Sequence, residues 1–259
     1  MLRIPAVVLV FLLLTPVLIA AIWLLERARL RGGAQLTVAY YRLLRRLLRV
    51  RVNVQGQATR QQPALIVANH ASWLDIVVIS SLAPVAFIAK REVASWPLIG
   101  QAARAQGSIF VDRSKRQQTA AVGAEIARRL REGTSVVLFA EGTSSDGNRV
   151  LPFRSALLGA VGDVAAKADG RTFTVQPLSI CYTRFQGLPL GRQHRPLVAW
   201  YGDLDFIPHL KEFICRGAVD AVVTWGPPVA YDNAADRKVL VRSLEQTIRG
   251  LTAEMLRRQ

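Results

Sequence analysis

The longest uncharged stretch of the chain, Ile4 to Leu25, constrains the structure most. Its 22 residues would span about 33 Å as a helix, which is enough to cross a hydrocarbon core of about 30 Å. A re-entrant hairpin bent at Pro16 is an alternative. A cleaved signal peptide fits less well, because its apolar core is normally about 7 to 15 residues long and no clear small-x-small cleavage site is present.

Arginines around this stretch predict its orientation. Arg27, Arg29 and Arg31 follow it, whereas Arg3 alone precedes it. Because positive residues favour the cytoplasmic side, we expect residues 1–30 to anchor the chain in the cytoplasmic (inner) membrane, with the rest facing the cytoplasm. The chain has only two cysteines, which give no disulfide framework and suit a reducing compartment.

The segment 31–56 predicts a basic amphipathic helix suited to an anionic membrane surface. A helix packed by its leucines onto the domain is the alternative, and the two are compatible. The chain carries a formal net charge of +16, and residues 1–60 contain ten arginines against one glutamate. The adjoining apolar stretch favours a bilayer with anionic lipid over nucleic acid as the partner. The basic face of the expected helix consists of Arg42, Arg45, Arg46 and Arg49, and its apolar face of Leu43, Leu44, Leu47 and Leu48.

The remaining segment, 57–259, is expected to form a single α/β domain. It is long enough for a sizeable core, and stretches rich in β-branched and aromatic residues alternate with helical patterns. This alternation indicates a mixed, mainly buried β-sheet flanked by helices. The expected strands are residues 63–68, 109–111, 135–139, 173–182, 197–201 and 218–225, and the expected helices are residues 73–82, 117–131 and 236–257.

His70 and Asp75 lie where the first of these strands gives way to a helix. With His70 before the first turn and Asp75 inside it, the carboxylate can reach back to the imidazole. A carboxylate bonded to one ring nitrogen fixes the tautomer and leaves the other nitrogen free to take a proton, which is general-base chemistry. The alternative is an ordinary turn with an aspartate near a helix N-terminus, where the helix dipole favours it.

Three further blocks follow in order. They are Gly107-Ser108-Ile109-Phe110-Val111-Asp112-Arg113, Phe139-Ala140-Glu141-Gly142-Thr143 and Val175-Gln176-Pro177-Leu178. Together with Asn69-His70-Ala71-Ser72-Trp73-Leu74-Asp75, this order resembles the four blocks of the glycerolipid acyltransferase family, which includes 1-acylglycerol-3-phosphate acyltransferase. The resemblance covers about residues 58–182.

This resemblance implies an O-acyltransferase that transfers a fatty acyl group from a thioester of acyl-carrier protein or coenzyme A to a lysolipid hydroxyl. His70 would deprotonate the hydroxyl, Asp75 would orient His70, and no acyl-enzyme would form. Neither a cofactor nor a metal is expected. The fourth block is associated with donor binding or packing. The residues that the resemblance assigns to the acceptor are Lys90, Gly107, Phe110, Arg113, Glu141, Gly142 and Thr143. Ser144 and Arg149, which follow the third block, are also expected to bind substrate.

The third block departs from the family pattern. The family usually has arginine after Glu-Gly-Thr, where this chain has Ser144. Either Arg149 or Arg154 could replace that phosphate-binding arginine. The form Glu-Gly-Thr-Ser-Ser-Asp-Gly also looks like the branch that acylates lyso-ornithine lipid, whose headgroup carries an amine and a carboxylate but no phosphate. Asp146 could meet that amine, or with Gly147 could close a turn. The sequence leaves lysophosphatidate and lyso-ornithine lipid nearly even as acceptors.

Other chemistries remain open. A lipid-binding protein, a thioesterase or a lysolipase could use the same fold, the hydrolases with water in place of the lysolipid. Cys181 could in principle form an acyl-enzyme, although within an apolar strand it is expected to be a small hydrophobe. Ser72 is expected to cap the helix start rather than to act as a nucleophile. His194 and His209 lack metal-ligand spacing and are expected in exposed loops.

Overall fold

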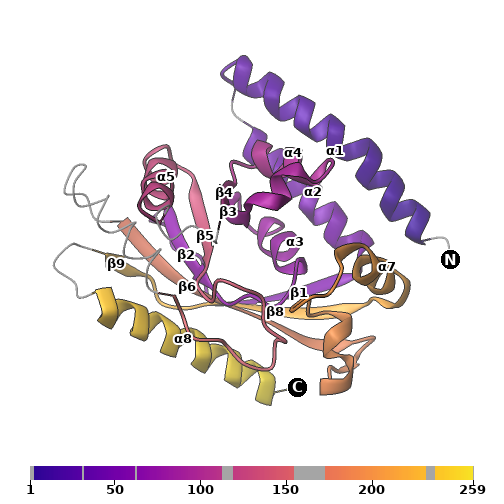
Figure 1. Cartoon of the computed structure of the whole chain (residues 1–259), viewed down its shortest axis with the longest axis vertical. Coiled ribbons are helices and arrows are strands. Elements are labelled where there is room, and N and C mark those ends of the chain that lie inside the picture. The colour runs from indigo at the N-terminus through magenta and orange to yellow at the C-terminus, as the bar shows by residue number, and fades with distance from the viewer. Residues whose placement is uncertain are drawn as a thin grey trace.

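A mixed β-sheet forms the centre of the molecule (Figure 1). The structure is a computed structural model, and it describes residues 3–30, 32–61, 63–112, 119–154, 173–231 and 237–258. Within these residues the sheet has nine strands. They are β1 (Val50–Gln55), β2 (Ala64–Ala68), β3 (Val85–Lys90), β4 (Ile109–Val111), β5 (Ser135–Phe139), β6 (Phe173–Phe185), β7 (Leu188–Pro189), β8 (Val219–Trp225) and β9 (Val229–Tyr231).

The strands follow the order β1-β8-β6-β2-β5-β3-β4, with β7 and β9 paired to β6. The contiguous strands β6, β2, β5, β3 and β4 are parallel, whereas β8 is antiparallel to β6. Every residue of β2 and β5 is buried, as expected for parallel strands covered on both faces. The predicted mixed, mainly buried sheet is therefore confirmed.

Helices cover both faces of the sheet. Residues of α2, α3 and α7 pack on the face that includes Ile66 and Ala68, whereas α5 and α8 pack on the face that includes Leu65 and Val67. Figure 1 shows α8 on one side of the sheet and α1, α2 and α3 on the other. The helices are α1 (Arg3–Arg27), α2 (Gly33–Leu47), α3 (Leu74–Ser80), α4 (Ile99–Ala105), α5 (Thr119–Arg131), α7 (Phe206–Arg216) and α8 (Arg237–Arg257), with 3₁₀ helices η1 (Arg91–Ser95) and η3 (Arg192–Leu197).

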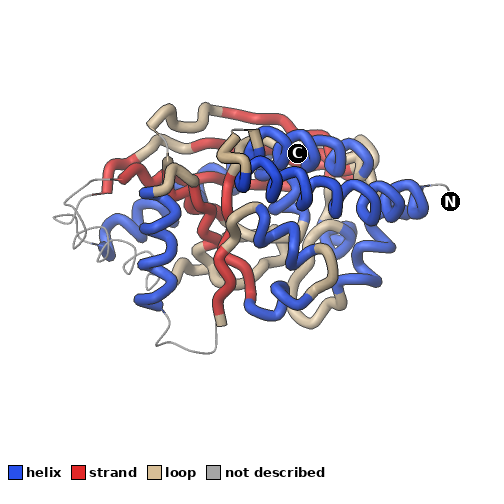
Figure 2. The backbone as a smooth tube through the Cα atoms, turned by 90° about the horizontal axis from the view of Figure 1, so that it is seen from above, coloured by secondary structure: helices blue, strands red, loops and turns tan. Residues whose placement is uncertain are grey.

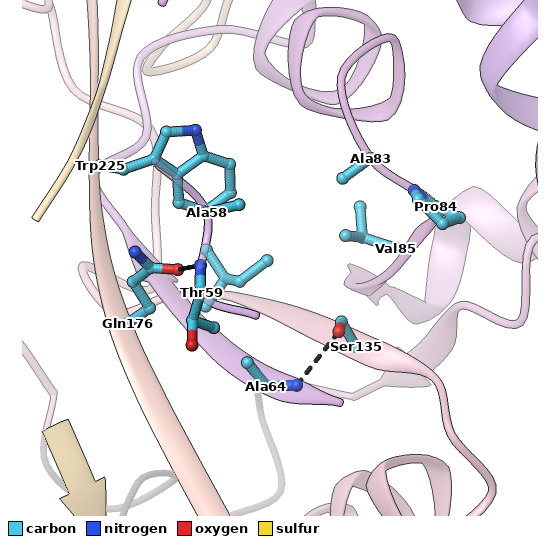
Figure 3. A pocket seen from close by; sticks show the side chains of 10 residues that line it. Ala58, Thr59, Ala64, Ala83, Pro84, Val85, Ser135, Gln176 and Trp225 are labelled. Carbon is cyan, nitrogen blue, oxygen red and sulfur yellow. Dashed lines mark hydrogen bonds between the residues drawn. The ribbon is translucent and has the colours of Figure 1, made fainter. Parts of the chain in front are cut away.

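The apolar N-terminal stretch forms one uninterrupted helix, α1, which contains Pro16. A re-entrant hairpin bent at that proline is therefore wrong. Ile4–Leu25 is long and apolar enough to cross a membrane. The helix contacts α2, α4 and α7, with Val7 and Ile22 buried, while eight of its large apolar side chains are exposed. Seen from above, its N-terminal end extends beyond the strands (Figure 2).

The segment 31–56 is only partly helical. The helix α2 ends at Leu47, and Arg49 has a positive φ of 54°, which turns the chain into β1. That strand pairs with β8, so its residues belong to the sheet rather than to a surface helix. Within α2 the leucines do pack onto the domain, since Leu44 is buried, while Arg42 and Arg46 are exposed.

A second difference concerns residues 197–201, which form no strand. Residues Arg192–Leu197 are instead a 3₁₀ helix that contains Pro196. The backbone N–H groups of Val198 and Ala199 bond to the carbonyl of Arg195, and that of Trp200 bonds to the carbonyl of Ala71, so they are not available to a strand ladder. The β-branched and aromatic content of this segment did not reveal this. The expected strands β2, β4, β5, β6 and β8 and the expected helices α3, α5 and α8 are present, with ends that shift by a few residues.

Candidate active site

The parallel strands β2, β5 and β3 have their carboxyl ends at one edge of the sheet (Figure 1). β2 ends at Ala68, directly beside Phe139 at the end of β5. His70 follows the first of these strands and Glu141 follows the second. Ligand sites of open α/β sheets lie at this edge, because loops leave the strands there in neighbouring positions.

His70 and Asp75 are in direct contact. The Nδ1 atom of His70 lies 2.7 Å from Oδ2 of Asp75. The same oxygen accepts hydrogen bonds from the backbone N–H groups of Ala71 at 2.8 Å and Ser72 at 3.0 Å. Asp75 is fully buried in the first turn of α3, whereas the His70 side chain is 14% exposed. The carboxylate therefore reaches back to the imidazole, as the spacing predicts.

Three contacts fix the position of His70. Its ring stacks on Phe139, with centroids 4.0 Å apart and planes inclined by 15°. Its backbone N–H donates to Oε1 of Glu141 at 2.8 Å, and its carbonyl oxygen accepts from the backbone N–H of Ser145 at 2.8 Å. Because a carboxylate only accepts, Nδ1 carries the proton, and Nε2 is left with the lone pair that a general base needs.

Glu141 helps to hold His70 in place through a backbone hydrogen bond. It is 2% exposed, and its two carboxylate oxygens accept from the backbone N–H groups of His70 and Leu151, each at 2.8 Å. Burial raises the pKa of Glu141 to about 7, against the opposing effect of these two hydrogen bonds. The resemblance assigns Glu141 to the acceptor; in the structure its two carboxylate oxygens hold two backbone segments together.

The residues after Glu141 form a loop that is bonded to His70 through the backbone N–H of Ser145. Thr143 is exposed and Ser144 is half-buried, whereas Arg149 is exposed farther along the same loop. Asp146 accepts from the backbone N–H and the side-chain amide of Asn148, both at 2.9 Å. Although desolvation opposes ionisation, these hydrogen bonds hold the pKa of Asp146 below its ordinary value. The turn interpretation of Asp146 therefore has direct structural support.

Arg154 lies against the Glu-Gly-Thr block. Its backbone N–H donates to the carbonyl of Ala140 at 2.8 Å, which returns the chain to the end of β5. A Cβ atom at Gly142 would lie 2.8 Å from Cδ and 2.9 Å from Nε of Arg154, so the arginine stem crosses directly over this glycine. Of the two arginines considered as replacements at Ser144, Arg154 is the one in contact with the block.

Of the remaining predicted residues, Lys90, Phe110 and Gly107 lie on or beside β3 and β4. Lys90 is exposed at the carboxyl end of β3, and Phe110 is half-buried on β4, with the guanidinium of Arg104 5.6 Å from its ring centroid. Gly107 lies at the opposite, amino end of β4, where its φ of 79° ends the turn after α4. The structure therefore gives Gly107 a role in the turn and not in the site. Arg113 lies outside the described residues.

Several residues of the site carried no clear signal in the sequence. Tyr182 donates its hydroxyl to Oδ1 of Asp75 at 2.6 Å. The side chain of Asn69 exchanges two hydrogen bonds with the backbone of Ile180, which joins β2 to β6 beside His70. Buried Arg195 donates through Nη1 to the carbonyls of Gly147 and Tyr182. Only Asn69, inside the first block, could have been selected from motif spacing.

The structure disfavours other nucleophiles. Burial raises the pKa of the Cys181 thiol to about 11, so the thiolate is scarce near neutrality. Ser72 accepts a hydrogen bond from the backbone N–H of Leu74 at 3.3 Å, in keeping with a role at the helix start.

His209 is not in an exposed loop: it is buried in α7 and accepts at Nδ1 from the Trp73 indole at 3.0 Å. His194 is half-buried and stacks on Phe185.

Comparisons with known proteins agree with this architecture. The model of the family described as "Acyltransferase" matches residues 49–181. The chain is 43% identical to the lyso-ornithine lipid O-acyltransferase of Rhizobium meliloti (strain 1021) over 96% of this chain and 84% of that protein. It is 45% identical to the enzyme of the same name from Brucella abortus (strain 2308) over 84% of this chain and 81% of that protein.

The fold also matches a solved structure. It is the crystal structure of the 1-acyl-sn-glycerophosphate (LPA) acyltransferase PlsC from Thermotoga maritima, with a TM-score of 0.64 and 20% identity over 96% of this chain and 95% of that one. At this identity the likeness concerns the fold alone. The family model and the two relatives carry the assignment: the chain belongs to the acyltransferase family and is an acyltransferase.

Proposed function

We propose that this acyltransferase transfers a fatty acyl group from an acyl thioester to the free hydroxyl of a lysolipid, with lyso-ornithine lipid as its preferred acceptor. The observation that carries the proposal is the His70–Asp75 pair, joined at 2.7 Å on the carboxyl edge of the sheet. The partly exposed imidazole has a free Nε2, and the carboxylate behind it is fully buried. This arrangement suits deprotonation of an alcohol.

The reaction follows from that geometry. Nε2 of His70 takes the proton of the acceptor hydroxyl while Asp75 stabilises the imidazolium that forms. The acceptor oxygen then attacks the thioester carbonyl carbon, and the resulting tetrahedral intermediate collapses with cleavage of the carbon–sulfur bond. The leaving thiolate receives the proton from His70, so a new ester and a free thiol are formed. No acyl-enzyme is needed.

The choice of acceptor rests on charge. Ser144 stands where the family usually has an arginine, which removes one contact to a phosphate. Arg154, packed over Gly142, is a cation at this block that can pair with the carboxylate of an ornithine headgroup. The names of the relatives from R. meliloti and B. abortus support the same acceptor. Lysophosphatidate is the competing acceptor.

We further propose that the reaction takes place at the cytoplasmic face of the inner membrane. The apolar α1 and the arginine excess after it support this placement. Soluble thioesters of acyl-carrier protein and coenzyme A are both available there, and either thiol can leave in the step above.

An acceptor comparison tests the proposal. Membranes that contain the full chain are given labelled acyl thioester with either lyso-ornithine lipid or lysophosphatidate, and the products are separated by thin-layer chromatography. We expect label in ornithine lipid and at least tenfold less in phosphatidate. Label mainly in phosphatidate would overturn the acceptor assignment, and release of labelled free acid without a diacyl product would identify a hydrolase. Membranes without the protein provide the background.

A further inference from the structure

Tyr182 is the residue beside the His70–Asp75 pair for which neither the sequence motifs nor the proposed mechanism provides a role. It is buried on β6, and its hydroxyl lies 2.6 Å from Oδ1 of Asp75. His70 bonds the other oxygen, Oδ2. The carboxylate is thus held between an imidazole on one side and a phenol on the other.

The fold brings Tyr182 to this position by an unusual extension of β6. The strand runs beside β2 as far as Leu178, opposite Ala68, and then continues beyond the carboxyl end of β2. Its register with β8 shifts between Tyr182 and Arg184, which marks a β-bulge. Bulges occur next to active sites because they change the direction of a side chain.

The hydrogen bonds of Asp75 are unevenly divided. Oδ2 receives three donors, namely the His70 ring and the backbone N–H groups of Ala71 and Ser72. Among the described residues, Tyr182 alone donates to Oδ1. A fully buried carboxylate needs donors on both oxygens, since an unsatisfied charge inside a protein is strongly unfavourable.

We propose that Tyr182 is a positioning residue that fixes Asp75 and moderates its pull on the proton of His70. A donor on Oδ1 withdraws negative charge from the carboxylate, so the His70 imidazolium is less stabilised than it would be beside an unshared carboxylate. Loss of this donor should therefore strengthen the interaction of Asp75 with the imidazolium. This inference rests on the proposed role of His70 as the general base.

The other titratable and charged groups around the pair are the same in wild type and in a variant that lacks only the Tyr182 hydroxyl. Burial raises the pKa of Tyr182 well above its ordinary value and that of Cys181 to about 11, so both keep their protons in an assay near neutrality. Glu141, whose pKa is about 7, titrates within the assayed range, and Arg195 donates to the Tyr182 carbonyl. Both residues are present in wild type and variant, so their effect is common to the two pH profiles.

The test is Tyr182→Phe in the full-length protein, which removes the hydroxyl and keeps the ring. We expect the acid limb of the kcat/KM profile to move up by about half to one pH unit, with activity on the alkaline plateau within about fivefold of wild type. A one-unit shift is a tenfold change in the protonation equilibrium. The matched control is Tyr40→Phe, which loses another buried tyrosine hydroxyl that is bonded to Thr15 at 2.6 Å and not to Asp75. The control should leave the acid limb in place.

A second measurement removes the dependence on turnover. Diethylpyrocarbonate modifies neutral imidazole, so the pH dependence of His70 modification, followed by mass spectrometry, reports its protonation directly. Tyr182→Phe should shift that curve in the same direction. An unmoved acid limb and an unmoved modification curve in the folded variant would overturn the role of Tyr182. Full activity of His70→Ala would instead overturn the proposed mechanism, so the two failures are distinguishable.

Discussion

At the scale of single residues, the block Glu-Gly-Thr combines two tasks that its sequence does not separate. Glu141 faces inward and ties His70 to Leu151, whereas Thr143 and Ser144 lie on the accessible part of the same loop. The motif identified the correct segment but could not tell which side chain would be buried. That distinction depends on the backbone N–H groups that converge on Glu141, and these come from His70, just after β2, and from Leu151.

The position of Ser144 leads to a prediction on acceptor choice. Ser144→Arg restores the cation that the family usually carries, and a hydrogen bond between charged groups contributes roughly 1.5 to 3 kcal/mol. We expect kcat/KM for lysophosphatidate to rise by about one to two orders of magnitude, with a smaller change for lyso-ornithine lipid. The measurement is the two-acceptor assay at fixed thioester concentration. Ser144→Gln is the matched control without charge, and an equal gain in that variant would contradict the charge argument.

Glu141 leads to a prediction on stability and pH. Its pKa of about 7 in the folded protein exceeds the ordinary value of 4.5. Between these two values the unfolded chain releases a proton that the folded protein keeps, so this group lowers the free energy of unfolding as pH rises from about 4.5 to 7. Glu141→Gln cannot titrate, and its amide places a donor against a backbone N–H.

We therefore expect Glu141→Gln to be less stable than wild type, by a margin that narrows as pH rises through that window. Chemical denaturation in detergent at a series of pH values measures the margin. Glu132→Gln, at an exposed position on the surface, controls for loss of a carboxylate. A margin that widens with pH would show that Glu141 is ionised throughout.

At the scale of elements, the N-terminal helix is more closely joined to the domain than an anchor needs to be. Thr15, in the middle of α1, is fully buried and shares a hydrogen bond of 2.6 Å with the hydroxyl of Tyr40 on α2. Hydropathy identified α1 but treated it as a separate segment, because a pattern of apolar residues does not reveal a partner helix. The strand β1 was missed for a related reason: Arg51, Asn53 and Gln55 resemble a surface segment until β8 pairs with it.

The Thr15–Tyr40 contact can be tested by a double-mutant cycle. Thr15→Val should leave the Tyr40 hydroxyl buried without its partner and lower the free energy of unfolding by about 1 to 3 kcal/mol. The double variant Thr15→Val, Tyr40→Phe should recover part of this loss, because both polar groups are then removed. Thermal unfolding in detergent measures the cycle. Strictly additive losses would mean that the two hydroxyls do not interact.

At the scale of the whole molecule, the site exists because the parallel strands β2, β5 and β3 end at one edge while their parallel neighbour β6 continues past it. Alternation of strands and helices was enough to predict an α/β sheet, and motif order was enough to predict that His70, Asp75 and the loop after β5 meet. Strand order was not predictable, so the approach of β6 to β2 and the contact of Tyr182 with Asp75 could not be foreseen. Gly107, which the resemblance assigns to the acceptor, lies at the amino end of β4, away from the carboxyl edge that carries His70.

The most direct test of His70 as the general base is the rate of labelled ornithine lipid formation by His70→Ala relative to wild type, with thioester consumption followed in the same samples. Removal of the general base should lower product formation by at least three orders of magnitude, while thermal unfolding and membrane association remain as in wild type. The control is His194→Ala, which replaces a half-buried histidine outside the His70–Asp75 pair and should remain active. Product formation by His70→Ala within tenfold of wild type would contradict the central role of this histidine.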